Sequence, residues 1–312
     1  MKKVVILATG GTIAGVGEPG KNTGYVSGQV SGEALVASVP GLGDGAEIMV
    51  EQVCNINSDD ITDKLWIELA NRINALQNDG SVAGIVVTHG TDTMDETAYF
   101  LSLTVKGEKP VILTGSMRPS TALEPDGPGN LRGAVQTVLD FCEGRIPSRN
   151  LVWVYFAGGL FDARRVQKCS ASALNAMGVD APGEGENLNV PAERNFFDVS
   201  NVECLPRVPV VYFTAGANPK ILEYATSVSD GLVIAGAGSG EFSQAWADTL
   251  AKVKIPVVIA SRIHHGLVTL NETLASGRIS AGRLPPQKAA VLLRLALTVT
   301  GRVDEIKRVF GL

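Results

Sequence analysis

Short apolar segments that end in glycine and small polar residues recur along the chain and constrain its fold more than any other feature. The first is Val4–Leu7, which continues through Ala8 and Thr9 into Gly10–Gly11 and Thr12. A short apolar run bounded by glycines is typical of a buried strand, and the glycines allow a sharp turn where a side chain would block a ligand. Thr12 is therefore expected at the carboxyl end of a strand, where open α/β sheets bind ligands.

Further apolar segments in the first half of the chain end in the same kind of loop. They continue into Asn55–Asp60, Thr88–Thr93 and Thr114–Pro119. Serine, threonine, aspartate and glycine are ordinary turn formers. These loops nevertheless hold few long charged side chains, and they set threonine directly beside aspartate. We interpret them as parts of one shared site rather than as separate turns.

Segments with helical periodicity or strong apolar character separate these strands. In the first half they cover residues 61–76, 94–103 and 130–141. Such alternation favours right-handed crossovers and a parallel sheet. The pattern starts again after residues 178–195, with apolar runs at 208–213, 232–235 and 257–261, and Pro285–Pro286 then open an apolar helix through Leu297.

The sequence thus predicts a two-domain α/β protein. The larger N-terminal domain has a mostly parallel sheet flanked by helices, and the smaller C-terminal domain is also α/β. A chain of 312 residues exceeds the usual size of a single core. We predict an N-terminal catalytic domain over residues 1–180, a linker over 181–207 and the C-terminal domain over 208–312.

Composition and charge exclude several classes of function. The net charge of −5 gives no basic footprint for nucleic acid, and no apolar run has the length of a membrane span. The apolar run after Met1 is too short for a secretory signal. The cysteines form no C-x-x-C pair, which fits a reducing compartment. We therefore expect a cytoplasmic protein with no nucleic-acid or membrane partner.

Metal and nucleotide chemistry lack their usual parts. The sequence has no G-x-S-x-G elbow and no phosphate loop, and His89, His264 and His265 do not have the helical spacing of metal ligands. The segment Gly15–Gly20 matches the dinucleotide pattern, but no strand directly precedes it and a proline stands where a helix would open. We expect no metal and no cofactor, and we interpret His89 as a hydrogen-bonding loop residue.

Hydroxyl groups, a lysine and carboxylates remain as candidates for chemistry. A threonine hydroxyl becomes a nucleophile when a base takes its proton, and a lysine amine can serve if its pKa is lowered. Thr91 beside Asp92, with Lys168 folded back toward them, suits acyl transfer. Backbone N–H groups at Gly11 and Gly90 are expected to stabilise an oxyanion.

The glycine-rich segment Val16–Gly28 holds a single aromatic residue, Tyr25. Two interpretations stay open on the sequence. The segment is either a mobile lid that closes over a ligand and excludes water, or an ordinary surface loop.

At the level of motifs, the chain resembles the bacterial-type L-asparaginases over nearly its whole length. The matching segments are Ala8–Gly15, Thr88–Met94 with Glu96–Ala98, Gly115–Pro119 with Asp126–Pro128, and Pro286–Ala289. The resemblance implies a two-domain α/β enzyme that hydrolyses the side-chain amide of asparagine, often with some glutaminase activity, and without a cofactor. It also implies a homotetramer built from intimate dimers, with active sites between subunits.

The resemblance also implies site residues. The catalytic set is Thr12, Tyr25, Thr91, Asp92 and Lys168. In this family the first threonine is acylated and the tyrosine is its lid partner, while the other three residues form a second triad. The substrate-binding set is Ser58, Asp59, Thr91, Asp92, Ser116, Ser239 and Glu272. In the family the residue matching Ser58 binds the substrate carboxylate, and the triad aspartate binds the α-amino group.

The chain departs from the secreted members of the family at several positions. Asp59 stands where they usually have glutamine or glutamate, so the contact to the substrate amine moves. Ser239 matches the form seen in enzymes with more glutaminase activity. Glu272 is the nearest match to the glutamate that supports the lid tyrosine, and the segment 169–195 is shorter than in the secreted enzymes. The ratio of asparaginase to glutaminase activity stays open.

The leading hypothesis is an amidohydrolase that converts L-asparagine to L-aspartate and ammonia through an acyl-Thr12 intermediate. The alternative is a non-catalytic sensor or partner subunit that binds an amino acid on the same fold. The presence of Thr12, Thr91, Asp92 and Lys168 disfavours it, because a binding protein needs no two threonine nucleophile candidates. An amidotransferase subunit is disfavoured because the chain has no room for a partner domain.

Overall fold

The computed structural model describes residues 2–146, 150–179 and 196–311. These residues divide into two compact units. The first contains residues 2–179 with 198–200, and the second contains 196–197 with 201–311. Most of the predicted linker, 181–207, lies outside the described residues, so the domain boundaries stay a prediction. Among the helices of the described ranges, none combines the length and apolar character that a membrane crossing requires.

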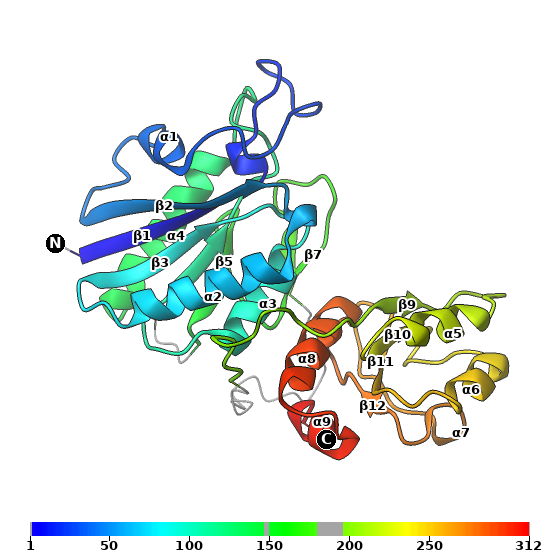
Figure 1. Cartoon of the computed structure of the whole chain (residues 1–312). Coiled ribbons are helices and arrows are strands. Elements are labelled where there is room, and N and C mark those ends of the chain that lie inside the picture. Colours follow the sequence, from blue (N-terminus) through cyan, green and yellow to red (C-terminus); the bar gives the residue numbers. More distant parts are fainter. Residues whose placement is uncertain (1, 147–149, 180–195, 312) are drawn as a thin grey trace. The chain divides into compact units, whose positions relative to one another are not determined.

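The first unit is built on a six-stranded sheet with the order β2-β1-β3-β4-β5-β6 (Figure 1). Its strands are β1 (Lys2–Gly10), β2 (Ala46–Ile56), β3 (Val82–Thr88), β4 (Val111–Thr114), β5 (Val152–Phe156) and β6 (Gly159–Asp162). The first five run parallel, and β6 is antiparallel to β5. A two-stranded antiparallel ribbon follows, formed by β7 (Val166–Lys168) and β8 (Met177–Val179). The parallel arrangement brings the carboxyl ends of β1 to β4 to one edge.

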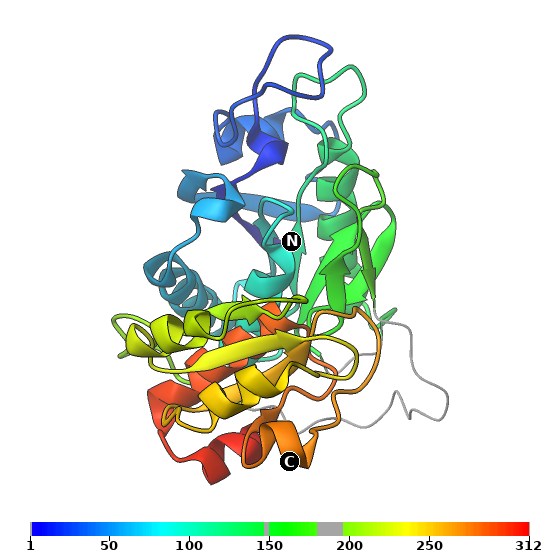
Figure 2. The same ribbon diagram turned by 90° about the vertical axis from the view of Figure 1, so that its right-hand side faces the viewer.

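Helices cover both faces of this sheet. They are α1 (Gly32–Ala37), α2 (Asp63–Gln77), α3 (Met94–Thr104) and α4 (Gly127–Cys142). α1 and α4 lie on one face, and α2 and α3 lie on the other (Figure 1). Two 3-10 turns, η1 (Thr12–Ala14) and η2 (Ser58–Asp60), follow β1 and β2. Figure 2, a view turned by 90°, shows that the loop after η1 and the loop before α4 stand side by side at one end of this unit.

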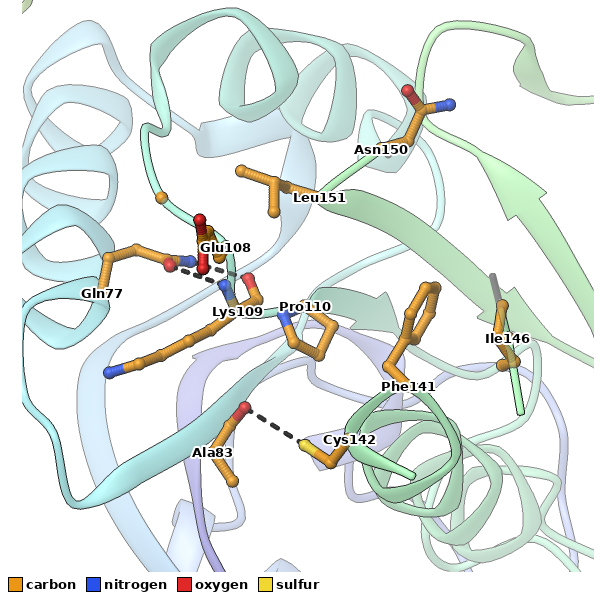
Figure 3. A pocket seen from close by; sticks show the side chains of 11 residues that line it. Gln77, Ala83, Glu108, Lys109, Pro110, Phe141, Cys142, Ile146, Asn150 and Leu151 are labelled. Atoms are coloured by element: carbon orange, nitrogen blue, oxygen red, sulfur yellow. Dashed lines mark hydrogen bonds between the residues drawn. The ribbon is translucent and has the colours of Figure 1, made fainter. Parts of the chain in front are cut away.

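The amino ends of β3, β4 and β5 border a cavity of about 550 Å³ (Figure 3). Its polar groups bond within the protein: the side-chain amide of Gln77 pairs with the backbone N–H and carbonyl of Lys109 at 2.9 and 2.8 Å. The thiol of Cys142 donates to the carbonyl of Ala83 at 3.5 Å. The cavity thus lies at the opposite ends of these strands from the loops that the sequence singles out.

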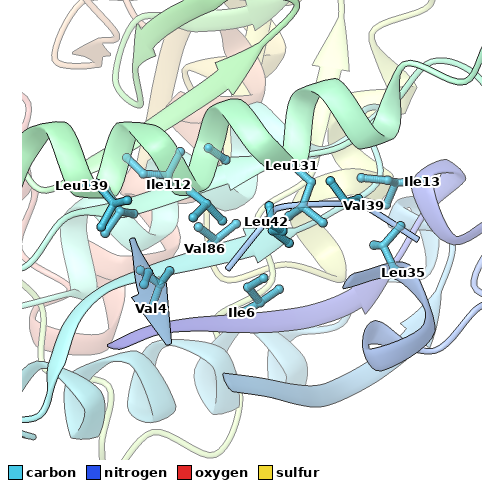
Figure 4. Packing of buried hydrophobic residues seen from close by; sticks show 14 of the residues in the cluster. Val4, Ile6, Ile13, Leu35, Val39, Leu42, Val86, Ile112, Leu131 and Leu139 are labelled. Carbon is cyan, nitrogen blue, oxygen red and sulfur yellow. The ribbon is translucent and has the colours of Figure 1, made fainter. Parts of the chain in front are cut away.

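The core between the sheet and α4 explains why the strands are so apolar. Val4 and Ile6 of β1 are fully buried, and they pack with Val86 and Ile112 beneath Leu131 of α4 (Figure 4). Alternate residues of a strand point to opposite faces, so Val5 and Leu7 face α2 and α3. A strand buried on both faces reads as an unbroken apolar run.

The second unit has a four-stranded parallel sheet with the order β12-β11-β10-β9. The strands are β9 (Val210–Tyr212), β10 (Leu232–Gly236), β11 (Val257–Ser261) and β12 (Ile279–Ser280). The helices are α5 (Lys220–Ser227), α6 (Gln244–Leu250), α7 (Glu272–Ala275), α8 (Pro286–Val299) and α9 (Val303–Val309). One face of the sheet packs against Leu222 and Trp246, and the other packs against Leu293 and Ile306.

The predicted fold class is confirmed. Every strand that the apolar runs predict is present, within a few residues of its expected ends. The pattern gave no indication of α1, β6, β7, β8 or β12, nor of the helices α5, α6, α7 and α9 of the second unit. These elements are only two to eight residues long, which is too short for a hydrophobic period to emerge.

Candidate active site

Three loops at the carboxyl ends of β1, β2 and β3 are in direct contact through glycine. Gly11 has a φ of 78°, and a Cβ atom there would lie 2.5 Å from the backbone nitrogen of Gly90. A Cβ atom at Gly90 would lie 2.7 Å from the Oγ of Ser58. Distances this short exclude any side chain. The glycines therefore let Thr12, Thr91 and Ser58 come close together, as the shared-site interpretation requires.

Thr12 is buried at the start of η1. Its Oγ1 lies 2.8 Å from the hydroxyl of Tyr25, with either oxygen able to donate. The ring of Tyr25 packs on the backbone of Gly15, where a Cβ atom would lie 2.8 Å from the ring Cδ2. The structure thus brings the first predicted pair together.

Tyr25 belongs to the segment Val16–Gly28, which we call the lid. The lid doubles back on itself, because Val16 and Val26 exchange backbone hydrogen bonds of 3.0 and 2.9 Å. Its end is tied to the site by the Gly28 N–H, which donates to the carbonyl of Gly11 at 3.3 Å. The segment has the contacts of a lid in its closed position, and its mobility stays a prediction.

Thr91 and Lys168 form the second group. The Nζ of Lys168 donates to the Oγ1 of Thr91 at 2.9 Å and to the Oδ1 of Asp92 at 2.5 Å. Thr91 is buried, and the Lys168 side chain is 16% exposed. Lys168 reaches this position because β7 ends there, which is the return to the sheet edge that the sequence suggested. The Asp92 side chain is 53% exposed, so its free oxygen is accessible to a ligand.

Ser58 is buried against Gly90, the residue directly before Thr91. Within the described part of the chain its hydroxyl has no hydrogen-bond partner. A buried hydroxyl without a partner costs free energy unless a ligand satisfies it. The neighbouring Asp59 is exposed, and its Oδ2 accepts a hydrogen bond of 2.8 Å from the side chain of Asn57.

The remaining predicted substrate residues lie in different places. Ser116 is buried after β4, and its hydroxyl donates to the carbonyl of Arg118 at 2.7 Å, within its own loop. Ser239 is exposed in the turn after β10, and Glu272 is the exposed first residue of α7. Both belong to the second unit, so their part in the site stays a prediction.

One backbone prediction is wrong. The N–H of Gly11 donates to the carbonyl of Ile56 at 2.8 Å, which links the loops after β1 and β2. It is therefore not free to stabilise an oxyanion. The sequence could not reveal this bond, because it joins residues that only the sheet brings together. The Gly90 N–H stays a candidate for that role.

His89 is a hydrogen-bonding loop residue, as predicted. Its Nδ1 donates to the carbonyl of Gly90 at 2.8 Å, so the tautomer leaves Nε2 as the acceptor for Thr97, 3.1 Å away. Thr97 in turn accepts from the indole of Trp66 at 2.8 Å. The ring is buried, and burial lowers the pKa of His89. A neutral, fully bonded imidazole fixes the backbone immediately before Thr91.

Other chemistry has little support at this edge of the sheet. Cys54 lies close by, but burial raises the pKa of its thiol to about 11, so it stays protonated at neutral pH. Among the residues that the structure describes, no His, Cys, Asp and Glu side chains are grouped as a metal site. None of the predicted site residues lines the cavity of Figure 3.

Comparisons with known proteins match the whole chain. Residues 3–196 match the family model described as asparaginase, N-terminal, and residues 207–310 match the glutaminase/asparaginase C-terminal domain. The chain is 39% identical to L-asparaginase 2 of Escherichia coli, covering 100% of this chain and 93% of that protein. It is 35% identical to the glutaminase-asparaginase of Acinetobacter glutaminasificans, covering 98% of each.

A solved structure is also similar. It is the probable cytoplasmic L-asparaginase of Campylobacter jejuni, with a TM-score of 0.90 and 36% identity. The match covers 100% of this chain and 99% of that one. Both units therefore have counterparts in one known architecture.

Proposed function

Because the chain belongs to the asparaginase family, we propose that it hydrolyses the side-chain amide of L-asparagine, and also that of L-glutamine, through an acyl-Thr12 intermediate. The observation that carries this proposal is the pair of buried threonine hydroxyls, one 2.8 Å from a phenol and the other 2.9 Å from an amine. A binding protein has no need of either arrangement.

In the first step the Oγ1 of Thr12 attacks the carbonyl carbon of the side-chain amide. The hydroxyl of Tyr25 is placed to accept the Thr12 proton while it passes its own proton to the amide nitrogen. The tetrahedral intermediate carries a negative oxygen, for which the Gly90 N–H is our candidate donor. When the C–N bond breaks, ammonia leaves with the proton and the acyl group stays on Thr12.

In the second step water attacks the acyl-enzyme, and L-aspartate is released. Lys168 and Thr91 are placed to orient this water and move its proton, since they form one hydrogen-bonded group with Asp92. General acid–base catalysis of this kind contributes roughly 10²–10⁴-fold.

The same geometry supports the binding roles. The hydroxyl of Ser58, which has no hydrogen-bond partner among the residues that the structure describes, is suited to the α-carboxylate of the substrate. The exposed carboxylate of Asp92 is suited to the α-amino group, and we propose that Asp59 contributes to the same contact. Ser116, Ser239 and Glu272 complete the set that we propose for the substrate.

We also propose a cytoplasmic homotetramer without a cofactor, built from intimate dimers. The four cysteines Cys54, Cys142, Cys169 and Cys204 are all free thiols, as expected in a reducing compartment. The similar Campylobacter jejuni protein is titled probable cytoplasmic. Sedimentation of the purified protein tests the assembly, and a stable monomer would contradict it.

Ammonia release from L-asparagine and from L-glutamine, measured over a range of concentrations, tests the activity. The matched control is Thr12→Ala, which removes the nucleophile from the site. We expect wild-type turnover with both amides and a loss of at least about 10³-fold in Thr12→Ala. Binding of L-asparagine without ammonia release would instead favour the amino-acid sensor, and wild-type turnover in Thr12→Ala would refute the acyl-Thr12 mechanism.

A further inference from the structure

The lid is held in place by a loop from another part of the sequence. The N–H of Gly17 donates to the Oγ1 of Thr121 at 3.0 Å, and the N–H of Gly20 donates to the carbonyl of Thr121 at 2.8 Å. In Figures 1 and 2 the two loops stand side by side at the same end of the first unit. Thr121 is thus bonded to the lid through both its side chain and its backbone.

Ser120 adds two contacts next to those of Thr121. Its backbone N–H and its hydroxyl both donate to the carbonyl of Gly15, at 3.0 and 2.6 Å. Gly15 is the residue on which the ring of Tyr25 packs. The contacts of Ser120 therefore fall on the residue just before the lid, on which the tyrosine ring packs, and those of Thr121 fall on the lid itself.

The supporting loop, residues 117–126, is itself braced. The carboxylate of Asp126 accepts the backbone N–H groups of Met117 and Arg118, each at 2.9 Å. The guanidinium of Arg118 donates to the carbonyl of Glu124 at 2.9 Å. Asp126 directly precedes α4, which is packed in the core. The loop is therefore a fixed support against which the lid can open and close.

Gly17 connects the support to the catalytic pair. A Cβ atom at Gly17 would lie 2.9 Å from the Cβ of Tyr25, so the two arms of the lid are packed directly on each other there. The hydrogen bond from Gly17 to Thr121 thereby fixes the arm that carries Tyr25. The hydroxyl of Tyr25 in turn reaches Thr12.

We propose that Thr121 is a positioning residue whose hydroxyl holds the lid closed and so keeps Tyr25 on Thr12. The catalytic consequence rests on the proposed function, whereas the effect on lid opening does not. Thr121→Val keeps the shape of the side chain and removes the acceptor of the Gly17 N–H. One such bond corresponds to about a fivefold change in the closure equilibrium.

Lys21 supplies a readout of lid opening that needs no turnover. It is the only lysine or arginine in the lid, and its side chain is 63% exposed. Trypsin cleavage after Lys21 requires a locally opened chain, so its rate follows the open population. The value of kcat/KM is proportional to the fraction of the enzyme whose lid is closed, so it falls when that fraction falls.

The two readouts are linked. Suppose that only enzyme with a closed lid reacts. The factor by which cleavage at Lys21 rises, multiplied by the factor by which kcat/KM falls, then equals the factor by which the closed-to-open equilibrium constant falls. For Thr121→Val we expect this product to be about five. Thr121→Ser keeps the acceptor and is expected to restore both values. Thr249→Val is the matched control, because the Thr249 hydroxyl donates to the Ala245 carbonyl within its own helix, at 3.0 Å, and lies outside the lid.

Each outcome decides a question. Unchanged cleavage and unchanged kcat/KM in Thr121→Val would overturn the proposal, as would a Thr121→Ser variant that behaves like Thr121→Val. In Thr121→Val the unfolding equilibrium constant, measured in urea, is expected to rise by the same factor as the cleavage at Lys21. A larger rise would indicate a purely structural role and would overturn the proposal. If trypsin cleaves Thr121→Val faster at Lys21 but the wild type releases no ammonia, the proposed function is contradicted and the role of Thr121 in lid closure is still supported.

Discussion

The two threonines of the site lie in similar places but are held in different ways. Thr12 follows β1 and Thr91 follows β3, the neighbouring strand, and both side chains are buried. The partner of Thr12 is Tyr25, which comes from the lid. The partner of Thr91 is Lys168, which comes from β7.

We therefore call Thr12 with Tyr25 the conditional pair, and Thr91 with Asp92 and Lys168 the permanent group. If the lid moves as we propose, the Thr12 pair forms only when the lid closes, because the lid carries Tyr25 to the nucleophile. The group of Thr91, Asp92 and Lys168 is fixed by the backbone of the sheet and ribbon, with His89 bonded to the carbonyl just before Thr91. Acylation is therefore expected to depend on lid motion, and deacylation on a preorganised group.

The largest expected effect tests the permanent group. Lys168→Met keeps an unbranched side chain and removes the amine from Thr91. We expect kcat to fall by about 10³-fold, because deacylation loses its proton-transfer group. Acylated Thr12 is then expected to accumulate, which mass spectrometry of the quenched reaction detects.

A matched control for this change is Lys64→Met, which breaks a lysine–carboxylate pair with Glu68 on the exposed face of α2. Its turnover is expected to equal that of the wild type. If Lys168→Met lost activity without an acylated intermediate, the division of labour between the two threonines would be wrong.

The next effect tests the conditional pair. Tyr25→Phe removes only the hydroxyl that lies 2.8 Å from Thr12. We expect kcat/KM to fall by about 10²-fold, because Thr12 loses the group placed to take its proton. In stopped-flow experiments the acylation step is expected to slow while deacylation is unchanged.

Tyr224→Phe serves as the control for the loss of a phenol hydroxyl, because Tyr224 is 71% exposed on α5. It is expected to keep wild-type kinetics. Slower deacylation in Tyr25→Phe would show that the lid tyrosine serves both threonines.

The smallest effect concerns the support of the permanent group. Burial lowers the pKa of His89, so the unfolded chain binds a proton on this residue at a higher pH than the folded chain does. Stability is therefore lost as the pH falls below about 6.5, the ordinary pKa of histidine. The unfolding free energy of the wild type is expected to fall between pH 7 and pH 5. In His89→Gln this fall is expected to be smaller, by as much as about 2 kcal/mol.

Urea unfolding at both pH values measures this difference. His264→Gln is the control, because His264 is exposed. Only the pH dependence matters here, since the substitution of a buried ring changes the stability at both values. An equal loss in the wild type and in His89→Gln would contradict the assignment of this pH dependence to His89.

The sequence by itself determined the strands and the residues at their ends. Val4–Leu7 had to be buried on both faces, and the glycines after it had to make a turn, so Thr12 was placed by local chemistry alone. The same argument placed Thr91 and Ser58. These positions follow from residues close in the chain, whose pattern decides burial and chain reversal.

Only the tertiary structure decided which side chains meet. Lys168 lies 77 residues from Thr91, and the Thr121 hydroxyl that holds the lid lies 104 residues from Gly17. The bond that occupies the Gly11 N–H, and the missing partner of the Ser58 hydroxyl among the described residues, also depend on packed neighbours. Contacts of this kind form when parallel strands align their ends, and no local period in the sequence records the distance between two side chains.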